Sequence, residues 1–427
     1  MTQPTEKPNI ASGVETNSGP AAKLKFANML ETLSYRDFRW VWIGSFVSFM
    51  AMNMQMITRS WLVLRVTDDS PLALTLVTLT FALPMTVVAP LAGALADRFS
   101  RKKLIIFSQI GSGIFTLFLG TLDFIGIVNF WHIMIIGIFN GSLMAINMPS
   151  RQAIISDIVP DSKLMNAISL NFSSMNLTRV AGPALAGFLI LLLDTSGVFF
   201  VIAVIYAFAA ITIGMVHYAP DREIKTGKNV GGDVLDGLRY VFRTPSLRGL
   251  FIMSFIPVIF GFSFMALVPA WAREALAIES DGLGILLMLM GIGATIGTLL
   301  LASIGNIPRR GMVMLGASLA WGISLAIFAQ LTSFAIAVPF LIFIGLTSSM
   351  YMSLNMTMVQ TKADPEMRGR TMSIAMMTFG MMPLSAVPFG TLAEKIGTGD
   401  SLTISGILLA VFTIGFAIIN KNFREMD

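Results

Sequence analysis

The sequence contains no cysteine and only two histidines among its 427 residues. The lack of cysteine excludes a disulfide framework, an iron–sulfur cluster and a thiol nucleophile. A metal centre is not expected, because His132 and His217 each fall at the end of an apolar run without a paired ligand. Since no Ser, His and Asp pattern indicates nucleophilic catalysis either, the sequence predicts neither an enzyme nor a cofactor.

Charge is also scarce. Asp, Glu, Lys and Arg make up 12% of the chain and hydrophobic residues 55%, whereas a soluble globular protein carries about 25% charged residues. That composition leaves too little polar surface for a water-soluble protein of this length. In lipid the backbone must satisfy its own hydrogen bonds, which favours helices. The chain is therefore predicted to be an all-α membrane protein.

Apolar runs long enough for transmembrane helices, which need about 20 residues, recur along the whole chain. Residues 1–20 are polar and lack the apolar core of a signal peptide, so we expect a disordered tail, followed by a possible short interfacial helix over 21–39. Twelve runs fall at about 40–64, 72–96, 104–123, 131–152, 164–193, 197–218, 249–271, 282–304, 312–330, 334–358, 371–396 and 401–420.

The basic residues indicate the orientation of these spans. Inside loops carry the excess of Lys and Arg. With the N-terminus inside, most of the 29 basic residues fall in the tails and inside loops, including Arg151 in the loop after the fourth span. Only Arg65, Arg273 and Lys395 fall in outside loops. Both termini are therefore predicted to be cytoplasmic, and the net charge of +5 needs no nucleic-acid partner.

A weak internal repeat divides the chain into two halves. Residues 39–46 align with 248–255 at an offset of 209, and at nearly the same offset Trp61 meets Trp271. Two parallel six-helix bundles would place a substrate cavity between them. The predicted parts are a cytoplasmic tail (1–36), an N-terminal six-helix bundle (37–218), a cytoplasmic linker (219–247) and a C-terminal six-helix bundle (248–427).

The loop between the second and third spans is the most specific motif. Residues 93–103 read GALADRFSRKK. They resemble the loop signature of the major facilitator superfamily, G-x-L-x-D-R-x-G-R-K/R-x, with Ser100 at the second glycine. The resemblance implies the major facilitator fold and a conformational latch between the halves, formed by Gly93, Asp97, Arg98, Arg101 and Lys102. The counterpart at 304–311 lacks the Asp, so the latch would be asymmetric.

Gly182, Pro183 and Gly187 in the fifth span are similar to the G-P-x-x-x-G element of the superfamily's antiporters and exporters. They would kink the helix and allow close packing, although glycine and proline are common in membrane helices. Further segments, at 36–39, 61–64, 149–152 and 368–370, resemble the branch that contains the enterobactin exporter and macrolide-efflux-type proteins. That resemblance implies a monomer in a bacterial inner membrane, exporting amphipathic drug- or siderophore-like molecules with proton coupling.

Polar residues inside the spans are the candidates for substrate binding. Arg59 and Arg179 are predicted to be the buried charges, and such cations usually face a cavity or a partner. Together they would suit an anionic group on the substrate. The candidate amides are Asn53, Gln55, Asn140, Asn147 and Asn355. Each could instead make a hydrogen bond between helices.

No carboxylate falls clearly at the centre of a span, where a proton antiporter normally needs one. Asp123, Asp157 and Glu394 are the candidates, at span ends or in a loop. Asn140 stands where many antiporters of the superfamily carry an arginine, so facilitated exchange stays open. Two further alternatives are an importer or exchanger of an anionic metabolite or lysolipid, and a non-transporting membrane sensor.

Overall fold

The structure is a computed structural model that describes residues 32–217, 230–304, 308–364, 367, 371–372, 374–375, 377–378 and 381–426. Within these ranges the chain is helical apart from short turns and contains no strand, as the all-α prediction requires. The expected interfacial helix over 21–39 falls largely outside them. Its described part holds a short 3₁₀ helix, η1 (Thr32–Ser34), and the start of α2 at Arg36.

Five helices make up a first group, defined as α2–α6. They are α2 (Arg36–Val66), α3 (Pro71–Arg98), α4 (Arg101–Phe124), α5 (Phe130–Ile158) and α6 (Asp161–Gly214). With 54 residues, α6 is too long for one membrane crossing. Asp194 interrupts it with non-helical angles (φ 57°, ψ 176°). α2 packs against α6, α3 against α5, and α4 against both α5 and α6.

The second group is defined as α8–α15. Its elements are α8 (Pro245–Ile256), the π-helical turn η2 (Pro257–Gly261), α9 (Ser263–Leu276), α10 (Ser280–Ile304), α11 (Arg310–Phe328), α12 (Phe334–Lys362), α14 (Met382–Ile396) and α15 (Thr398–Ile419). α7 (Val230–Arg243) precedes this group, inside the predicted linker, and α16 (Lys421–Arg424) follows it. α10 packs on α12, α11 on α12 and α15, and α14 on α9 and α15.

Nine helices in the described ranges are long and apolar enough to cross a membrane. α6 counts once among them although it carries two predicted spans. Many large apolar side chains remain exposed, such as Trp131, Val204 and Ile419, as expected where a surface meets lipid instead of water. The chain is therefore a multi-pass helical membrane protein, and the exact number of twelve spans stays a prediction.

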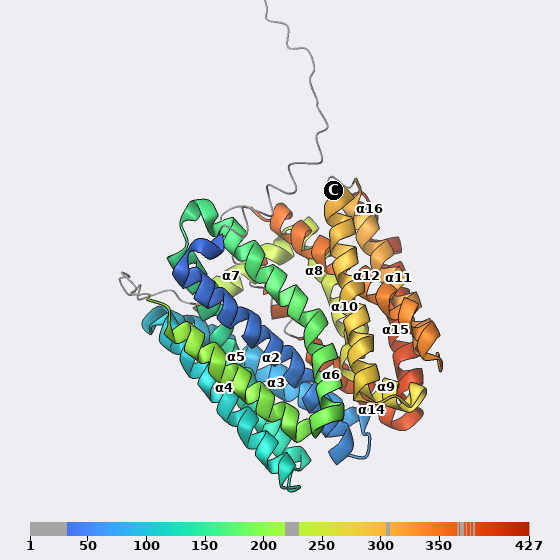
Figure 1. The fold of residues 1–427 in the computed structure, drawn as a ribbon. Helices are drawn as coiled ribbons and strands as arrows, with labels where there is room; N and C mark the ends of the chain where they lie inside the picture. The colour runs from blue at the N-terminus through green and yellow to red at the C-terminus, as the bar shows by residue number, and fades with distance from the viewer. Residues whose placement is uncertain are drawn as a thin grey trace, which may run out of the picture.

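The two groups lie side by side (Figure 1). The start of α2 and α16 lie at the same end of the molecule, which we call the terminal end. The opposite end, where α2 leads into α3 and α14 into α15, is called the far end. The groups touch through α6 and α10, through α3 and α14, and through α9 with α2 and α3. Transport in this arrangement depends on how those contacts are distributed between the two ends.

Candidate functional site

An ion pair joins the groups at the far end. The turn between α2 and α3 contains two consecutive residues with left-handed φ, Asp68 (49°) and Asp69 (65°), a conformation that Asp tolerates better than most residues. The turn presents Asp69 to Arg273 of α9, with 2.6 Å between nitrogen and oxygen. The Arg273 guanidinium also lies 5.2 Å from the ring centre of Trp61 in α2. Arg273 is thus held by two residues of the opposite group.

Glu394 of α14 makes a second connection at the far end. Its carboxylate accepts hydrogen bonds from the Ser70 hydroxyl (3.0 Å) and the Leu72 N–H (3.3 Å). The N–H groups of a helix's first turn lack partners within the helix and carry partial positive charge. Glu394 therefore caps α3 from the other group. α14 also packs closely on α3, because a Cβ added at Gly390 would lie 2.5 Å from the Thr75 hydroxyl.

The predicted helix-packing element lies where helices approach most closely. Ser280 of α10 donates a hydrogen bond to the Gly187 carbonyl of α6 (3.2 Å). A Cβ at Gly187 would lie 2.3 Å from the Ser280 carbonyl oxygen, and one at Gly284 2.7 Å from the Pro183 carbonyl oxygen. Gly182 faces α2 instead, where a Cβ would lie 2.6 Å from that of Asn53. These residues place α6 against both α2 and α10.

The α6 and α10 faces that touch at this contact become exposed toward the terminal end. On α6, Phe172, Asn176 and Arg179 continue the stripe of Pro183 and Gly187 at helical spacing, and all three are exposed. On α10, the stripe that contains Gly284 and Gly291 continues through Thr295 and Thr298, which are exposed as well. Along these helices the two groups are therefore in contact from the far end as far as Val180 and Gly291, and the faces beyond, toward the terminal end, are exposed.

Inside the first group, a row of buried polar side chains joins α2, α4, α5 and α6. We call this row the polar seam. Gln109 donates to Ser48 (2.7 Å), Gln55 donates to Thr116 (2.9 Å), and the Tyr206 hydroxyl donates to Gln55 (3.1 Å). Asn147 donates to Ser108 (2.6 Å). Gln55 and Asn147, two candidates for substrate contact, are thus engaged between helices.

Arg151 belongs to the polar seam and was misplaced by the sequence. It stands at the inner end of the predicted run 131–152 and was counted with the inside loop that follows, but it lies within α5 with 1% of its surface exposed. Its guanidinium donates to Ser45 (2.7 Å) and Asn147 (3.1 Å) and lies 5.6 Å from the ring centre of Phe49. The helical periodicity of the sequence could have indicated this position, because Asn140, Asn147 and Arg151 fall on one face of a helix.

The predicted buried cations have different surroundings. Arg59 is buried as expected, 9% exposed, with its guanidinium 5.0 Å from the ring centre of Phe81. Arg179 also lies well within a predicted span, in α6, but its side chain is exposed. Among the described residues, neither Arg59 nor Arg151 forms an ion pair with a carboxylate. The interior of the first group therefore carries positive charge without a described counter-charge.

Asn140 is 3% exposed, and neither its side-chain nitrogen nor its oxygen has a hydrogen-bond partner. It lines a cavity of about 10 Å³ with Gln55, Gln109 and Asn147, which is room for about one water molecule. Asn53 donates to the Phe49 carbonyl of its own helix (2.8 Å). Among the amides predicted in the first group, Asn140 is thus the one whose polar atoms are free to bind.

Asn355 of α12 makes in the second group a contact that corresponds to the contact of Arg151 with Ser45 in the first group. It is 1% exposed and donates to Ser254 (2.8 Å), the residue that the internal repeat aligns with Ser45. In the first group the same position receives a hydrogen bond from Arg151. The only basic residue of α12 is Lys362, at its end. The repeat has therefore kept the serine contact, whereas the buried cation belongs to the first group.

Two basic residues of the predicted latch, Arg101 and Lys102, bind within the first group. Arg101 pairs with Asp157 and donates to the Ala153 carbonyl (2.9 Å), which fastens α4 to α5. Lys102 donates to the carbonyls of Gly214 (2.8 Å) and Val216 (2.7 Å), where a helix C-terminus favours a cation. The surroundings of the Gly93, Asp97 and Arg98 side chains lie outside the described part of the chain. A latch between the groups stays a prediction.

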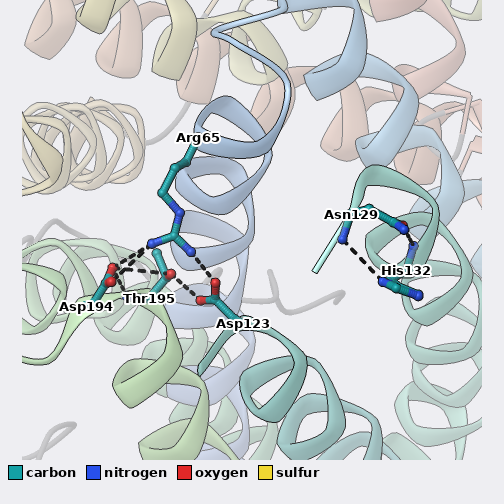
Figure 2. A network of polar contacts seen from close by, with 6 residues as sticks. All are labelled: Arg65, Asp123, Asn129, His132, Asp194 and Thr195. Atoms are coloured by element: carbon teal, nitrogen blue, oxygen red, sulfur yellow. Dashed lines mark hydrogen bonds and ion pairs between the residues drawn. The ribbon is translucent and has the colours of Figure 1, made fainter. Parts of the chain in front are cut away.

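Asp123, the third coupling candidate to be placed, lies in a network at the far end of the first group (Figure 2). Arg65 pairs with it and with Asp194 (2.9 Å), and the Thr195 hydroxyl donates to it. The sequence placed Arg65 in an outside loop, but it lies in the last turn of α2. Asp123 and Asp157 thus each bind an arginine of their own group, whereas Glu394 connects the two groups.

The same fold occurs in known transporters. A crystal structure of the nucleoside transporter NupG superposes with a TM-score of 0.70, covering 91% of this chain and 99% of that one at 16% identity. With the matching family model, this fold defines a transporter of the major facilitator superfamily. The chain belongs to its family of transmembrane secretion effectors, which matches residues 27–427.

Two characterised relatives span nearly the whole chain. It is 26% identical to the staphyloferrin A transporter of Staphylococcus aureus over 90% of this chain and 97% of that protein. It is 24% identical to macrolide efflux protein A of Streptococcus pyogenes over 91% of this chain and 97% of that protein. The family resemblance read from the loop motif is thereby confirmed, and the family consists of transporters, not enzymes.

Proposed function

We propose that the chain is a secondary active exporter of amphipathic small molecules that works by alternating access. One observation carries the proposal. α6 and α10 touch at Gly187 and Ser280, and their faces are exposed toward the terminal end. Such an arrangement is one of the two end states that rocking of two bundles requires. With cytoplasmic termini, as the basic residues predict, this state faces the cytoplasm, where an exporter loads its substrate.

The proposal includes twelve spans in two six-helix bundles (37–218 and 248–427) joined by a cytoplasmic linker, and a monomer in a bacterial inner membrane. The internal repeat supports the two halves, and the distribution of basic residues supports the orientation. Export is supported by the name of one relative, macrolide efflux protein A. The name of the staphyloferrin A transporter extends the range of molecules to siderophores.

The polar candidates take different roles in this proposal. Arg179 contacts the substrate, since its side chain is exposed and has no described carboxylate partner. Asn140 has unpaired polar atoms but is buried beside a cavity for about one water molecule, so it contacts the substrate only if the first group rearranges. Gln55, Asn147 and Asn355 hold helices together through the hydrogen bonds described above. Asn53 and Arg59 lie beside these contacts and act on the substrate only if the first group rearranges during transport.

Accumulation of fluorescent drugs and catechol siderophores in an efflux-deficient bacterium tests the proposal. Cells that express the chain should accumulate less of a transported compound, and an uncoupler should abolish the difference. Asp97→Asn should also abolish it if the loop acts as a latch. Asp281→Asn, at the start of α10, removes a partly exposed carboxylate as a matched control and should transport normally. Unchanged accumulation of every compound, with the protein present in the membrane, would refute broad export.

A further inference from the structure

Arg179 lies near the middle of a membrane crossing. At ~1.5 Å per residue it stands about 27 Å along α6 from Asp161 and about 22 Å before the break at Asp194. A charged side chain at that depth is too costly to face lipid hydrocarbon, and it normally faces the protein interior or a water-filled space. Since the side chain of Arg179 is exposed, the direction in which it points decides what it contacts.

The neighbours of Arg179 on α6 define that direction. Thr178 is fully buried, and Gly182 packs against Asn53 of α2. Pro183 and Gly187 pack against α10. With 100° between successive residues, Arg179 points between the directions of α2 and α10. The exposed apolar residues of this stretch, Leu177 (57%), Leu185 (41%) and Phe188 (56%), occupy the opposite, lipid-type face. Arg179 therefore faces the second group across the opening and not the lipid.

The surroundings of Arg179 suit a negatively charged ligand. Within the described part of the chain it has no carboxylate or hydrogen-bond partner. Asn176 and Phe172 follow on the same stripe, one and two turns toward the terminal end, and Phe172 is 52% exposed. In its interior, the first group holds Arg59 and Arg151 without a described counter-charge. The wall of the opening thus combines an unpaired guanidinium with an exposed aromatic ring.

We propose that Arg179 binds an anionic group, such as a carboxylate, on the transported molecule, and that Phe172 contacts its apolar part. A guanidinium can bind a carboxylate through two parallel hydrogen bonds, which a lysine cannot reproduce. The substrate class is then an amphipathic organic anion. This inference rests on the proposed transport function and narrows its substrates, because an unpaired cation in the opening disfavours cationic compounds.

A matched pair of xanthene dyes tests the inference directly. Carboxyfluorescein is anionic and tetramethylrhodamine methyl ester is cationic on the same ring system, and fluorescence anisotropy reports their binding to the purified full-length chain in detergent. The native chain should bind carboxyfluorescein more tightly. Arg179→Gln should weaken that binding by about ten- to a hundredfold, the value of a charged hydrogen bond. Arg179→Lys should fall between the two.

Arg248→Gln is the control, because it removes one exposed positive charge from the first turn of α8, away from the stripe. It should bind both dyes like the native chain. Equal binding of carboxyfluorescein by Arg179→Gln and the native chain would overturn the inference. So would a native chain that prefers the rhodamine or binds neither dye.

Export from cells separates this inference from the proposed function. Energised export of the rhodamine without binding of carboxyfluorescein would leave the exporter intact and refute the anionic substrate. Carboxyfluorescein binding that depends on Arg179, without energised export of either dye, would retain the anion site and refute the exporter.

Discussion

The Arg273 guanidinium of α9 lies 2.6 Å from the Asp69 carboxylate, which a left-handed turn between α2 and α3 holds toward the second group. The two residues are far apart in sequence and come from different helix groups. Together with Glu394 on the first turn of α3, this pair connects the groups at the far end. In an alternating-access cycle these contacts must break before that end opens.

Asp69→Asn should therefore favour opening of the far end. Asn tolerates the left-handed turn, so the substitution removes the charge and keeps the backbone. Partly exposed pairs contribute about 0.2–1 kcal/mol, which corresponds to up to about a fivefold change in the open population. The chain has no native cysteine, so Thr75→Cys, buried beside Gly390, provides a unique thiol whose labelling rate reports opening.

A thiol at Thr116→Cys, inside the first group, is the control and should label at an unchanged rate. Arg273→Gln should match Asp69→Asn, and the double variant should add nothing further if the two residues act only on each other. Additive effects of the two substitutions would contradict the pairing.

Gly187→Ala should block closure between α6 and α10. The new Cβ would lie 2.3 Å from the backbone carbonyl oxygen of Ser280, which cannot rotate away as a side chain can. Such overpacking costs about 1–3 kcal/mol, so thermal stability in detergent and transport should both fall. Gly316→Ala in α11 is the matched control, since no atom lies within 4 Å of its Cβ position. It should be neutral or stabilising, by up to about 1 kcal/mol.

Arg151→Met should leave the chain folded and no less stable. The arginine is buried without a described counter-charge, and an apolar side chain of similar size removes the cost of keeping that charge out of water. Transport should nevertheless decrease if the positive charge of the first group attracts the substrate. Thermal unfolding in detergent, measured for this variant and for the cavity-forming Arg151→Ala, checks the predicted stability. A loss of several kcal/mol in the Met variant would contradict the prediction and mean that the contacts of Arg151 with Ser45, Asn147 and Phe49 stabilise the chain.

Glu394→Gln should favour opening of the far end. A neutral amide binds the N–H groups at the start of α3 less strongly than a carboxylate does. Labelling of Thr75→Cys should therefore be faster in the Glu394→Gln background than in the native one. Glu274→Gln is the control, because Glu274 accepts a hydrogen bond from Thr398 of its own group (3.1 Å). Equal labelling of Thr75→Cys with and without Glu394→Gln would contradict a role for this contact in holding the far end closed.

The sequence by itself determined the class of the protein and the course of its helices. The apolar runs coincide with described helices, for example 104–123 with α4 and 312–330 with α11. This prediction succeeds because lipid requires the backbone to satisfy its hydrogen bonds locally. The loop motif at 93–103 predicted the superfamily, and Arg59 was correctly expected to be buried.

The tertiary structure alone decided which face of each helix is core, lipid-facing or directed at the other group. A run of apolar residues looks similar in all three surroundings, so the sequence did not show that the side chain of Arg179 is exposed within its span or that Arg151 is enclosed in α5. The contacts of Arg273 and Glu394 with the α2–α3 turn join residues distant in the chain. Such pairs depend on how the two groups meet, and no local pattern of sequence encodes that meeting.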